Sequence, residues 1–161
     1  MRGIDVVYLT PGNPYPYLRA QRRHPDHEAQ FERLASLARH PHFALVGIAG
    51  LSASGRSDVY VHAKAMIVDD AWATLGSCNL HAFSLFGHTE LNASLWDPGI
   101  ARAFRVALLA EHRGEDTSTL DDRAALALYR RVARENRAKR KRGDHAWRGI
   151  AYALDPVTYG E

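Results

Sequence analysis

Residues 60–80, YVHAKAMIVDDAWATLGSCNL, bring together side chains that could act on a phosphate group. His62 and Lys64 stand two residues apart in an apolar run, so on a strand both side chains point to the same face. A histidine can attack phosphorus or transfer a proton near neutral pH, and a lysine can neutralise a phosphate oxygen. Ser77 and Asn79 share a face in the same way and can donate hydrogen bonds to phosphate oxygens. The stretch therefore predicts one phosphate-binding pocket.

Three nearby residues extend this hypothesis. Glu90 leads into the run ELNASLW, and a carboxylate there could accept the Nδ1 proton of His62 and hold its tautomer. Asp69 falls on the strand face opposite His62, so we expect it to have a structural, hydrogen-bonding role. Cys78 is the only cysteine, which excludes an internal disulfide or a cysteine-based zinc site. No neighbour in the sequence would activate its thiol, so we expect it to be buried or to face along the strand.

The pattern His62-x-Lys64-x4-Asp69-x6-Gly76-Ser77-x-Asn79 resembles the full HKD signature of the phospholipase D superfamily, with every spacing intact. The segment RGIDVVYLTPG is similar to the strand that opens the corresponding part of that family. TELNASLWDP and FRVALLAEHRG are similar to the strand and the closing helix that follow the motif. The resemblance covers residues 2 to about 114 and extends weakly to the end of the chain.

This resemblance implies a metal-independent double displacement at a phosphodiester, so neither a metal nor a cofactor is expected. His62 would be the nucleophile that forms a phosphohistidine, or the general acid paired with a second histidine. Lys64, Ser77 and Asn79 would bind the phosphate oxygens, and Glu90 would orient His62. Asp69, which is part of the same motif, would have a structural role.

The family's active sites use two HKD motifs, and this sequence holds one, because none of the other eight histidines has a lysine two residues later. We therefore expect a second half or a homodimer partner. The chain resembles the C-terminal half of a phospholipase D-like enzyme that hydrolyses phospholipid head groups or transfers phosphatidyl groups, as cardiolipin synthases do. A homodimeric nuclease of the same superfamily and a non-catalytic remnant are the alternatives. The C-terminal extension and the segment LLAEHRG favour the lipid branch.

Hydrophobic periodicity predicts an α/β fold with a mixed β-sheet flanked by helices, in two parts. The first is a catalytic half-domain over residues 1–114, with the motif at 62–79, and the second a helical, basic extension over 115–161. The expected strands are 4–10, 43–48, 59–68, 72–75 and 91–96; the expected helices are 27–40, 100–111 and 120–140; the expected loops are 13–17 and 49–57, and residues 143–161 show no clear period. Since a core-like strand begins three residues into the chain, we expect neighbouring strands to be supplied from elsewhere.

Composition indicates the class of protein and its expected location. The chain of 161 residues is 46% hydrophobic and 24% charged, which is typical of a globular protein, and it holds no apolar run long enough to span a membrane. The N-terminal residues predict a strand rather than a signal peptide, so a cytoplasmic or peripheral membrane location is expected. Tyr15 and Tyr17 could line the mouth of the substrate site or pack within their loop.

The net charge of +3 conceals a strongly basic segment. Residues 130–142 hold eight lysines or arginines and one acid, which gives +7 there and 3 − 7 = −4 over the rest of the chain. Such a segment could contact an anionic membrane or a nucleic acid, or it could be a solvated helix face.

Overall fold

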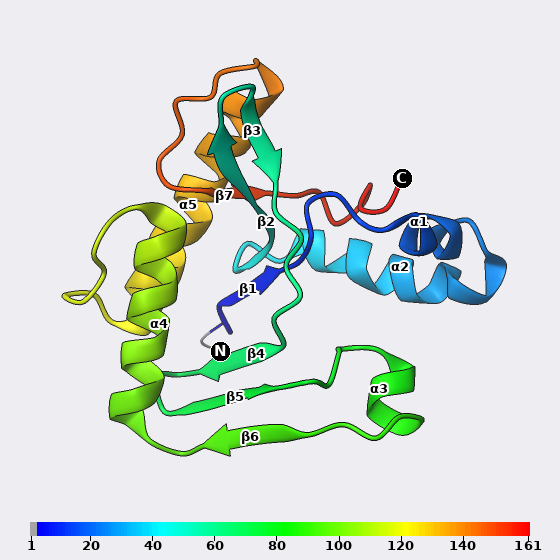
Figure 1. The fold of residues 1–161 in the computed structure, drawn as a ribbon, viewed down its shortest axis with the longest axis horizontal. Helices are drawn as coiled ribbons and strands as arrows, with labels where there is room; N and C mark the ends of the chain where they lie inside the picture. Colours follow the sequence, from blue (N-terminus) through cyan, green and yellow to red (C-terminus); the bar gives the residue numbers. More distant parts are fainter. Residues whose placement is uncertain (1–2) are drawn as a thin grey trace.

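The structure is a computed structural model that describes residues 3–161, and it divides the strands into two sheets (Figure 1). The strands are β1 (Val6–Leu9), β2 (Phe43–Ser52), β3 (Gly55–Asp58), β4 (Ala65–Val68), β5 (Trp72–Gly76), β6 (Asn92–Leu95) and β7 (Ala151–Ala153). The helices are α1 (Pro16–Arg22), α2 (Glu28–Ser36), α3 (Ala82–Phe86), α4 (Pro98–Arg113) and α5 (Asp122–Lys141), with short 3₁₀ turns at Pro25–His27 and Leu37–Arg39. The expected mixed α/β fold is confirmed.

The first sheet surrounds β2, the strand with the longest buried run. β1 pairs with β2 in parallel, β3 and β7 pair with it antiparallel, and helices α4 and α5 pack against this sheet. Val46 of β2 and Tyr129 of α5 are almost completely buried in the shared core. Residues on both sides of the expected boundary at residue 114 contribute to this core. The C-terminal extension is therefore packed against the part of the chain that precedes it.

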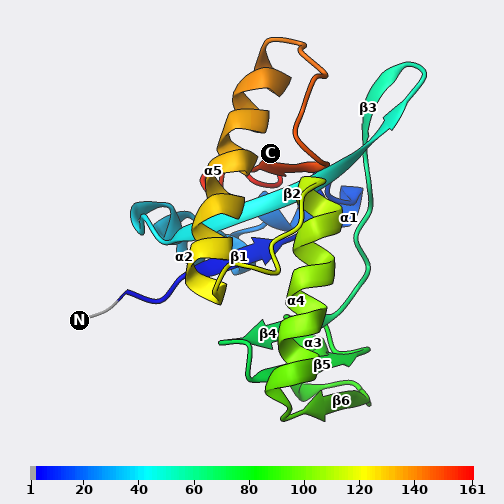
Figure 2. The ribbon, with the colours of Figure 1, turned by 90° about the vertical axis from the view of Figure 1, so that its left-hand side faces the viewer.

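The second sheet, β4–β5–β6, is an antiparallel meander below the first, and α4 contacts both β4 and β5 (Figure 2). Helix α4 begins where Asp97 accepts a hydrogen bond from the backbone N–H of Ile100 at 3.0 Å, with Pro98 in the first turn. It ends at Gly114, whose φ of 70° suits a left-handed C-cap. This single helix therefore spans both sheets.

Several predicted elements differ from the structure. Of the expected strand over 59–68, only β4 belongs to a strand ladder. Residues 59–64 form no strand, but backbone hydrogen bonds join Val59 to Ile48 of β2 and Lys64 to Gly76 of β5. The expected loop over 49–57 is a hairpin, since β2 continues to Ser52 and Gly55 takes a φ of 113° that favours glycine. The expected loop over 13–17 gives way to α1, because Pro16 suits the first position of a helix.

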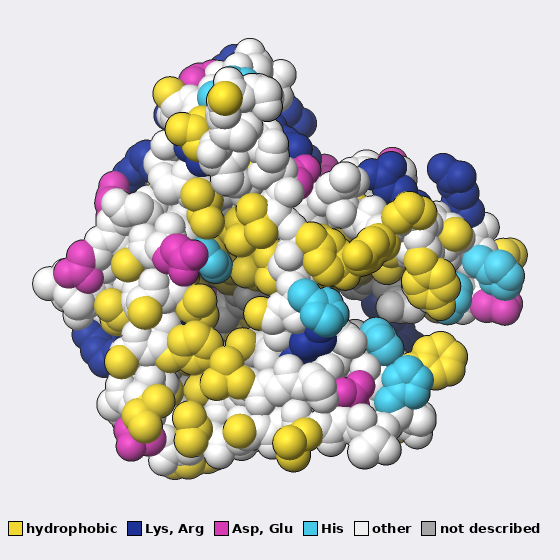
Figure 3. Space-filling view, viewed as in Figure 1, with side chains coloured by type: hydrophobic (Ala, Val, Ile, Leu, Met, Phe, Trp, Pro, Cys, Tyr) yellow, Lys and Arg dark blue, Asp and Glu magenta, His cyan; other side chains and the backbone are white. Residues whose placement is uncertain are grey.

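The second sheet leaves many apolar side chains exposed. Met66 is 50% exposed and Leu75 43%, and the surface view shows hydrophobic side chains gathered over the lower part of this face (Figure 3). Within the described residues β1 pairs only with β2, and β4 only with β5, so each keeps one free edge. That neighbouring strands are supplied from elsewhere stays a prediction. None of the described helices is both long and apolar enough to cross a bilayer.

Candidate active site

The extended segment before β4 presents a row of side chains at alternate positions. His62 is exposed, and its ring lies nearly parallel to that of Tyr60, with the centroids 6.1 Å apart. Tyr15 packs edge-on against Tyr60 at 4.6 Å. Lys64 donates a hydrogen bond from Nζ to the carbonyl oxygen of His62 at 2.7 Å, which keeps its ammonium group beside the histidine. In the described part of the chain the imidazole of His62 has no hydrogen-bond partner.

One backbone hydrogen bond joins the two halves of the motif. The N–H of Gly76, at the end of β5, donates to the carbonyl of Lys64 at 3.0 Å. A Cβ at Gly76 would lie 1.8 Å from Oδ1 of Asn92 and 2.3 Å from the carbonyl oxygen of Leu91. Only glycine fits at this position, because β6 passes so closely. This hydrogen bond therefore holds the end of β5, which Ser77 follows, beside the segment that carries His62 and Lys64.

Ser77 links the end of β5 to the segment before β6. Its Oγ donates to Oε2 of Glu90 at 2.5 Å and accepts from the N–H of Leu91 at 3.1 Å. The hydrogen bonds from Ser77 and Ser84 lower the pKa of Glu90 below its usual value. Among the described residues, this carboxylate accepts a hydrogen bond from Ser77. That Glu90 accepts the Nδ1 proton of His62 stays a prediction. No feature of the sequence indicated that Glu90 would bond to Ser77.

Ser84 is a residue near the candidate site that the sequence did not indicate. It is buried on α3, a helix that the sequence also did not predict, and its Oγ accepts from Nδ2 of Asn79 at 3.5 Å. Ser77 thus contacts Glu90 directly, and Asn79 contacts Ser84. The thiol of Cys78 between them is half-buried and lies 3.6 Å from the carbonyl oxygen of Asn79.

A comparison with known protein families bears on these residues. A sequence model of the family described as "Cardiolipin synthase, PLD-like domain" matches residues 1–110. The chain belongs to this family, within the phospholipase D superfamily.

Individual relatives agree with this assignment. The PLD-like chain is 24% identical to "Cardiolipin synthase 2" of Staphylococcus epidermidis over 96% of its own length and 26% of that protein. It is 36% identical to "Phospholipase D alpha 1" of Spuriopimpinella brachycarpa over 45% of its length and 10% of that protein. It is 31% identical to "Phospholipase D delta" of Arabidopsis thaliana over 46% of its length and 10% of that protein. The chain spans about a quarter or less of the relatives that it matches.

The structural, hydrogen-bonding role expected of Asp69 in this PLD-like chain stays a prediction, and its neighbour Asp70 makes the contacts described here. Both residues form the turn between β4 and β5 with positive φ, 52° and 51°. Asp69 is exposed, and its side chain has no hydrogen bond or ion pair within residues 3–161. Asp70 instead accepts two hydrogen bonds from Arg105 of α4, at 2.9 and 2.6 Å. Among residues 3–161, no group of three or more His, Cys, Asp or Glu side chains is arranged to hold a metal ion.

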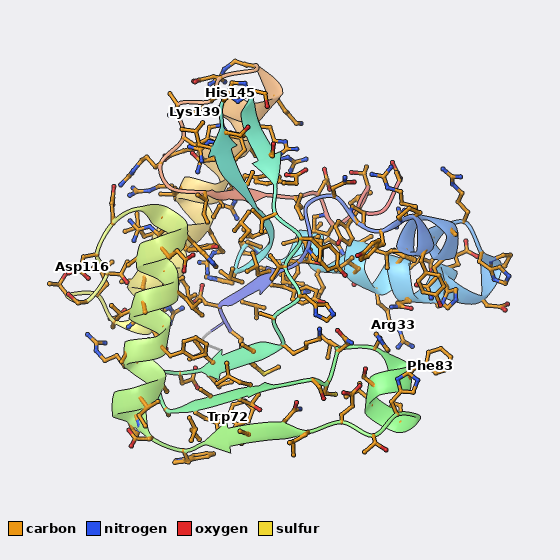
Figure 4. All side chains as sticks on the ribbon, viewed as in Figure 1. Arg33, Trp72, Phe83, Asp116, Lys139 and His145 are labelled. Carbon is orange, nitrogen blue, oxygen red and sulfur yellow. The ribbon has the colours of Figure 1, made fainter. Side chains whose placement is uncertain are left out.

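The basic segment 130–142 of the PLD-like chain ends far from these residues. Lys139, near the end of α5, stands at the opposite end of the molecule from Trp72 and Phe83, which mark the second sheet and α3 (Figure 4). Four of the eight cations in residues 130–142 form ion pairs: Arg130 with Asp5, Arg131 with Glu135, Arg137 with Asp155, and Arg140 with Asp58. Much of the charge counted in the sequence is therefore balanced within the fold.

Proposed function

We propose that this chain is one half of a phospholipase D-like phosphodiesterase that acts on phospholipids, by hydrolysis or by phosphatidyl transfer. The observation that carries the proposal is the hydrogen bond from the Gly76 N–H to the Lys64 carbonyl. It holds the segment that carries His62, the proposed nucleophile, and the cation of Lys64 against the end of β5, where Ser77 follows Gly76. This grouping is suited to a phosphate ester, and it agrees with the names of the relatives.

The residues suggest a two-step displacement. In the first step the unprotonated imidazole nitrogen of His62 forms a bond to phosphorus, and the bond from phosphorus to the leaving alcohol breaks. A second, protonated histidine gives its proton to that leaving oxygen. In the second step water or an acceptor alcohol loses a proton to the second histidine and displaces His62 from phosphorus. In the reverse assignment His62 is the acid and the second histidine the nucleophile.

Other side chains would stabilise the charge that develops on the non-bridging oxygens. Lys64 supplies a positive charge next to His62, and Ser77 and Asn79 supply neutral hydrogen-bond donors. Glu90 acts through Ser77, because its carboxylate fixes the direction of the Ser77 hydroxyl. Asp69 lies in the turn after β4 and would have no contact with the substrate.

The second histidine would come from another HKD half or from a second copy of this chain. The exposed apolar side chains of the second sheet and the free edges of β1 and β4 support a partner that covers this region. A homodimeric nuclease is the alternative function. The ion pairs within the basic segment speak against nucleic-acid binding by α5, because those arginines already have carboxylate partners.

The test is turnover of a soluble phosphodiester and of phospholipid vesicles in excess EDTA, over a hundredfold range of protein concentration. The substitution His62→Asn should lower the rate by at least about 10³-fold. His40→Asn, at an exposed histidine away from the motif, is the control and should leave the rate unchanged. Specific activity that rises with concentration would indicate that two copies complete the site. Activity that survives in His62→Asn would overturn the proposal, and activity on DNA alone would favour the nuclease.

A further inference from the structure

We propose that α1 and the tyrosines beside it form the surface by which this chain contacts an anionic lipid bilayer. We call this the tyrosine–arginine surface, and it consists of Tyr15, Tyr17, Tyr60, Arg19 and Arg23. The inference rests on the proposed function, because it assigns the place where phospholipid would reach His62. It also moves the expected membrane contact away from the basic helix α5.

Large aromatic side chains are exposed at this surface. Tyr15 is 59% exposed, Tyr17 68% and Tyr60 46%. Tyrosine rings favour the head-group level of a bilayer, where the ring meets apolar groups and the hydroxyl remains hydrated. A band of hydrophobic side chains crosses the middle of this face from β1 towards α1, with histidine and basic side chains directly below it (Figure 3).

The charge of α1 has one sign. Residues 13–24 contain three arginines and no acidic residue. Arg22 is used to hold the helix in place, since its guanidinium donates to the carbonyl of Val157 at 2.5 Å and lies 5.0 Å from the ring centroid of Phe31. Arg19 and Arg23 are exposed. Arg19 donates one hydrogen bond to Oδ1 of Asn13 at 2.7 Å, and neither exposed arginine has an acidic partner within the described residues, so the charge of both can meet lipid phosphates.

This surface is continuous with the candidate active site. The ring of Tyr15 is 4.6 Å from that of Tyr60, and the ring of Tyr60 is 6.1 Å from that of His62. Tyr60, His62 and Lys64 alternate along one extended segment, so they share a face. A bilayer in contact with the tyrosines would therefore hold its phosphodiesters at the depth of His62. The end of α5 offers no such continuity, because it lies at the far end of the molecule (Figure 4).

The experiment measures binding to lipid vesicles by flotation, with His62→Asn in every chain so that no lipid is turned over. The vesicles are phosphatidylcholine alone or with roughly a third phosphatidylglycerol. Replacing Arg19 and Arg23 by glutamine should lower the partition coefficient on anionic vesicles about 25-fold at low salt, about fivefold for each arginine. Tyr17→Ser should weaken binding to both kinds of vesicle, and Tyr17→Trp should restore it.

The matched control replaces Lys141 and Arg142 of the basic segment by glutamine, which removes the same two charges. We expect this pair to change the partition coefficient less than twofold. Equal or larger losses from the α5 pair, no binding by the starting chain, or binding of a DNA duplex in place of vesicles would each overturn the inference. Circular dichroism melts establish that the α1 variants are folded.

A second readout separates this inference from the proposed function. In chains that retain His62, the α1 variants should lower turnover of vesicle phospholipid and leave turnover of a soluble phosphodiester unchanged. If turnover did not depend on His62, the proposed function would be refuted, but the vesicle-binding result would still hold. Equal loss on both substrates would instead assign the α1 residues a structural role and overturn the inference.

Discussion

Both carboxylate oxygens of Asp70 accept hydrogen bonds from Arg105, one from Nε at 2.9 Å and one from Nη2 at 2.6 Å. Asp70 lies in the turn after β4, and the side chain of Arg105 is buried on α4. The pair therefore fastens the hairpin that follows Lys64 to the helix that spans both sheets. The hydrogen bond from Arg105 lowers the pKa of Asp70 below its usual value of 3.8.

Asp70→Asn should lower the free energy of unfolding by about 2–3 kcal/mol at pH 7, since asparagine tolerates positive φ but leaves the charge of Arg105 unpaired. Because the pKa of Asp70 is lower in the folded state, its stabilisation is present above the unfolded pKa and is lost as the pH falls through the folded one. The urea unfolding curves of the two proteins should therefore converge below pH 3.8. Asp69→Asn is the control, with a change below about 0.5 kcal/mol. An equal loss in both variants would contradict this assignment.

The Ser77–Glu90 hydrogen bond predicts that these residues act as a unit. Glu90→Gln should lower kcat/KM about tenfold, and Ser77→Ala about 10²-fold, because a misdirected hydroxyl gives weaker stabilisation of the phosphate oxygens. The double variant should be no slower than Ser77→Ala alone, since Glu90 acts only through Ser77. Steady-state kinetics of the four proteins on one soluble phosphodiester make this comparison. Fully additive losses would show that Glu90 has an independent role.

We predict that the buried His112 makes the folded chain less stable in mildly acidic solution. It is buried on α4, where its Nδ1 lies 3.0 Å from the hydroxyl of Tyr129, and burial lowers its pKa below 6.5. Below pH 6.5 the unfolded chain binds a proton that the folded chain does not, so stability falls as the pH drops, by at most about 1.4 kcal/mol per pH unit. His112→Gln should flatten the dependence between pH 7 and 5. His40→Gln, at an exposed histidine, should retain it.

Replacement of Arg140 tests whether the basic segment stabilises the folded chain. Its guanidinium donates to both oxygens of Asp58, at 2.7 and 2.9 Å, and lies 4.3 Å from the ring centroid of Tyr152. Arg140→Gln should lower the free energy of unfolding by about 1–2 kcal/mol, a figure reduced for the partial exposure of the arginine. Arg142→Gln removes the same charge at an exposed position and should cost less than about 0.5 kcal/mol. Urea denaturation at neutral pH measures both, and equal effects would refute the distinction.

Local pattern was enough to predict which residues of the candidate site could share a face. The two-residue spacing of His62 and Lys64 favours a common face, and in the structure the Lys64 ammonium group donates to the His62 carbonyl. For Ser77 and Asn79 a common face stays a prediction. Helix α5 followed from its apolar period, because a helix buries one face along its whole length.

Contacts between distant segments could not be predicted in this way. The sequence shows eight cations in residues 130–142, but three of them pair with Asp5, Asp58 and Asp155, which lie far away along the chain. Strand β7 has three residues, too few for a periodic pattern, and it exists because it pairs with β2.

By itself, the sequence determined which residues share a face, because alternation and helical period depend only on neighbours along the chain. Tertiary structure decided the partners: Ser77 for Glu90, and Arg105 for Asp70. The physical reason is that a carboxylate pairs with the donor that folding brings within about 3 Å, and such distances arise from packing between segments.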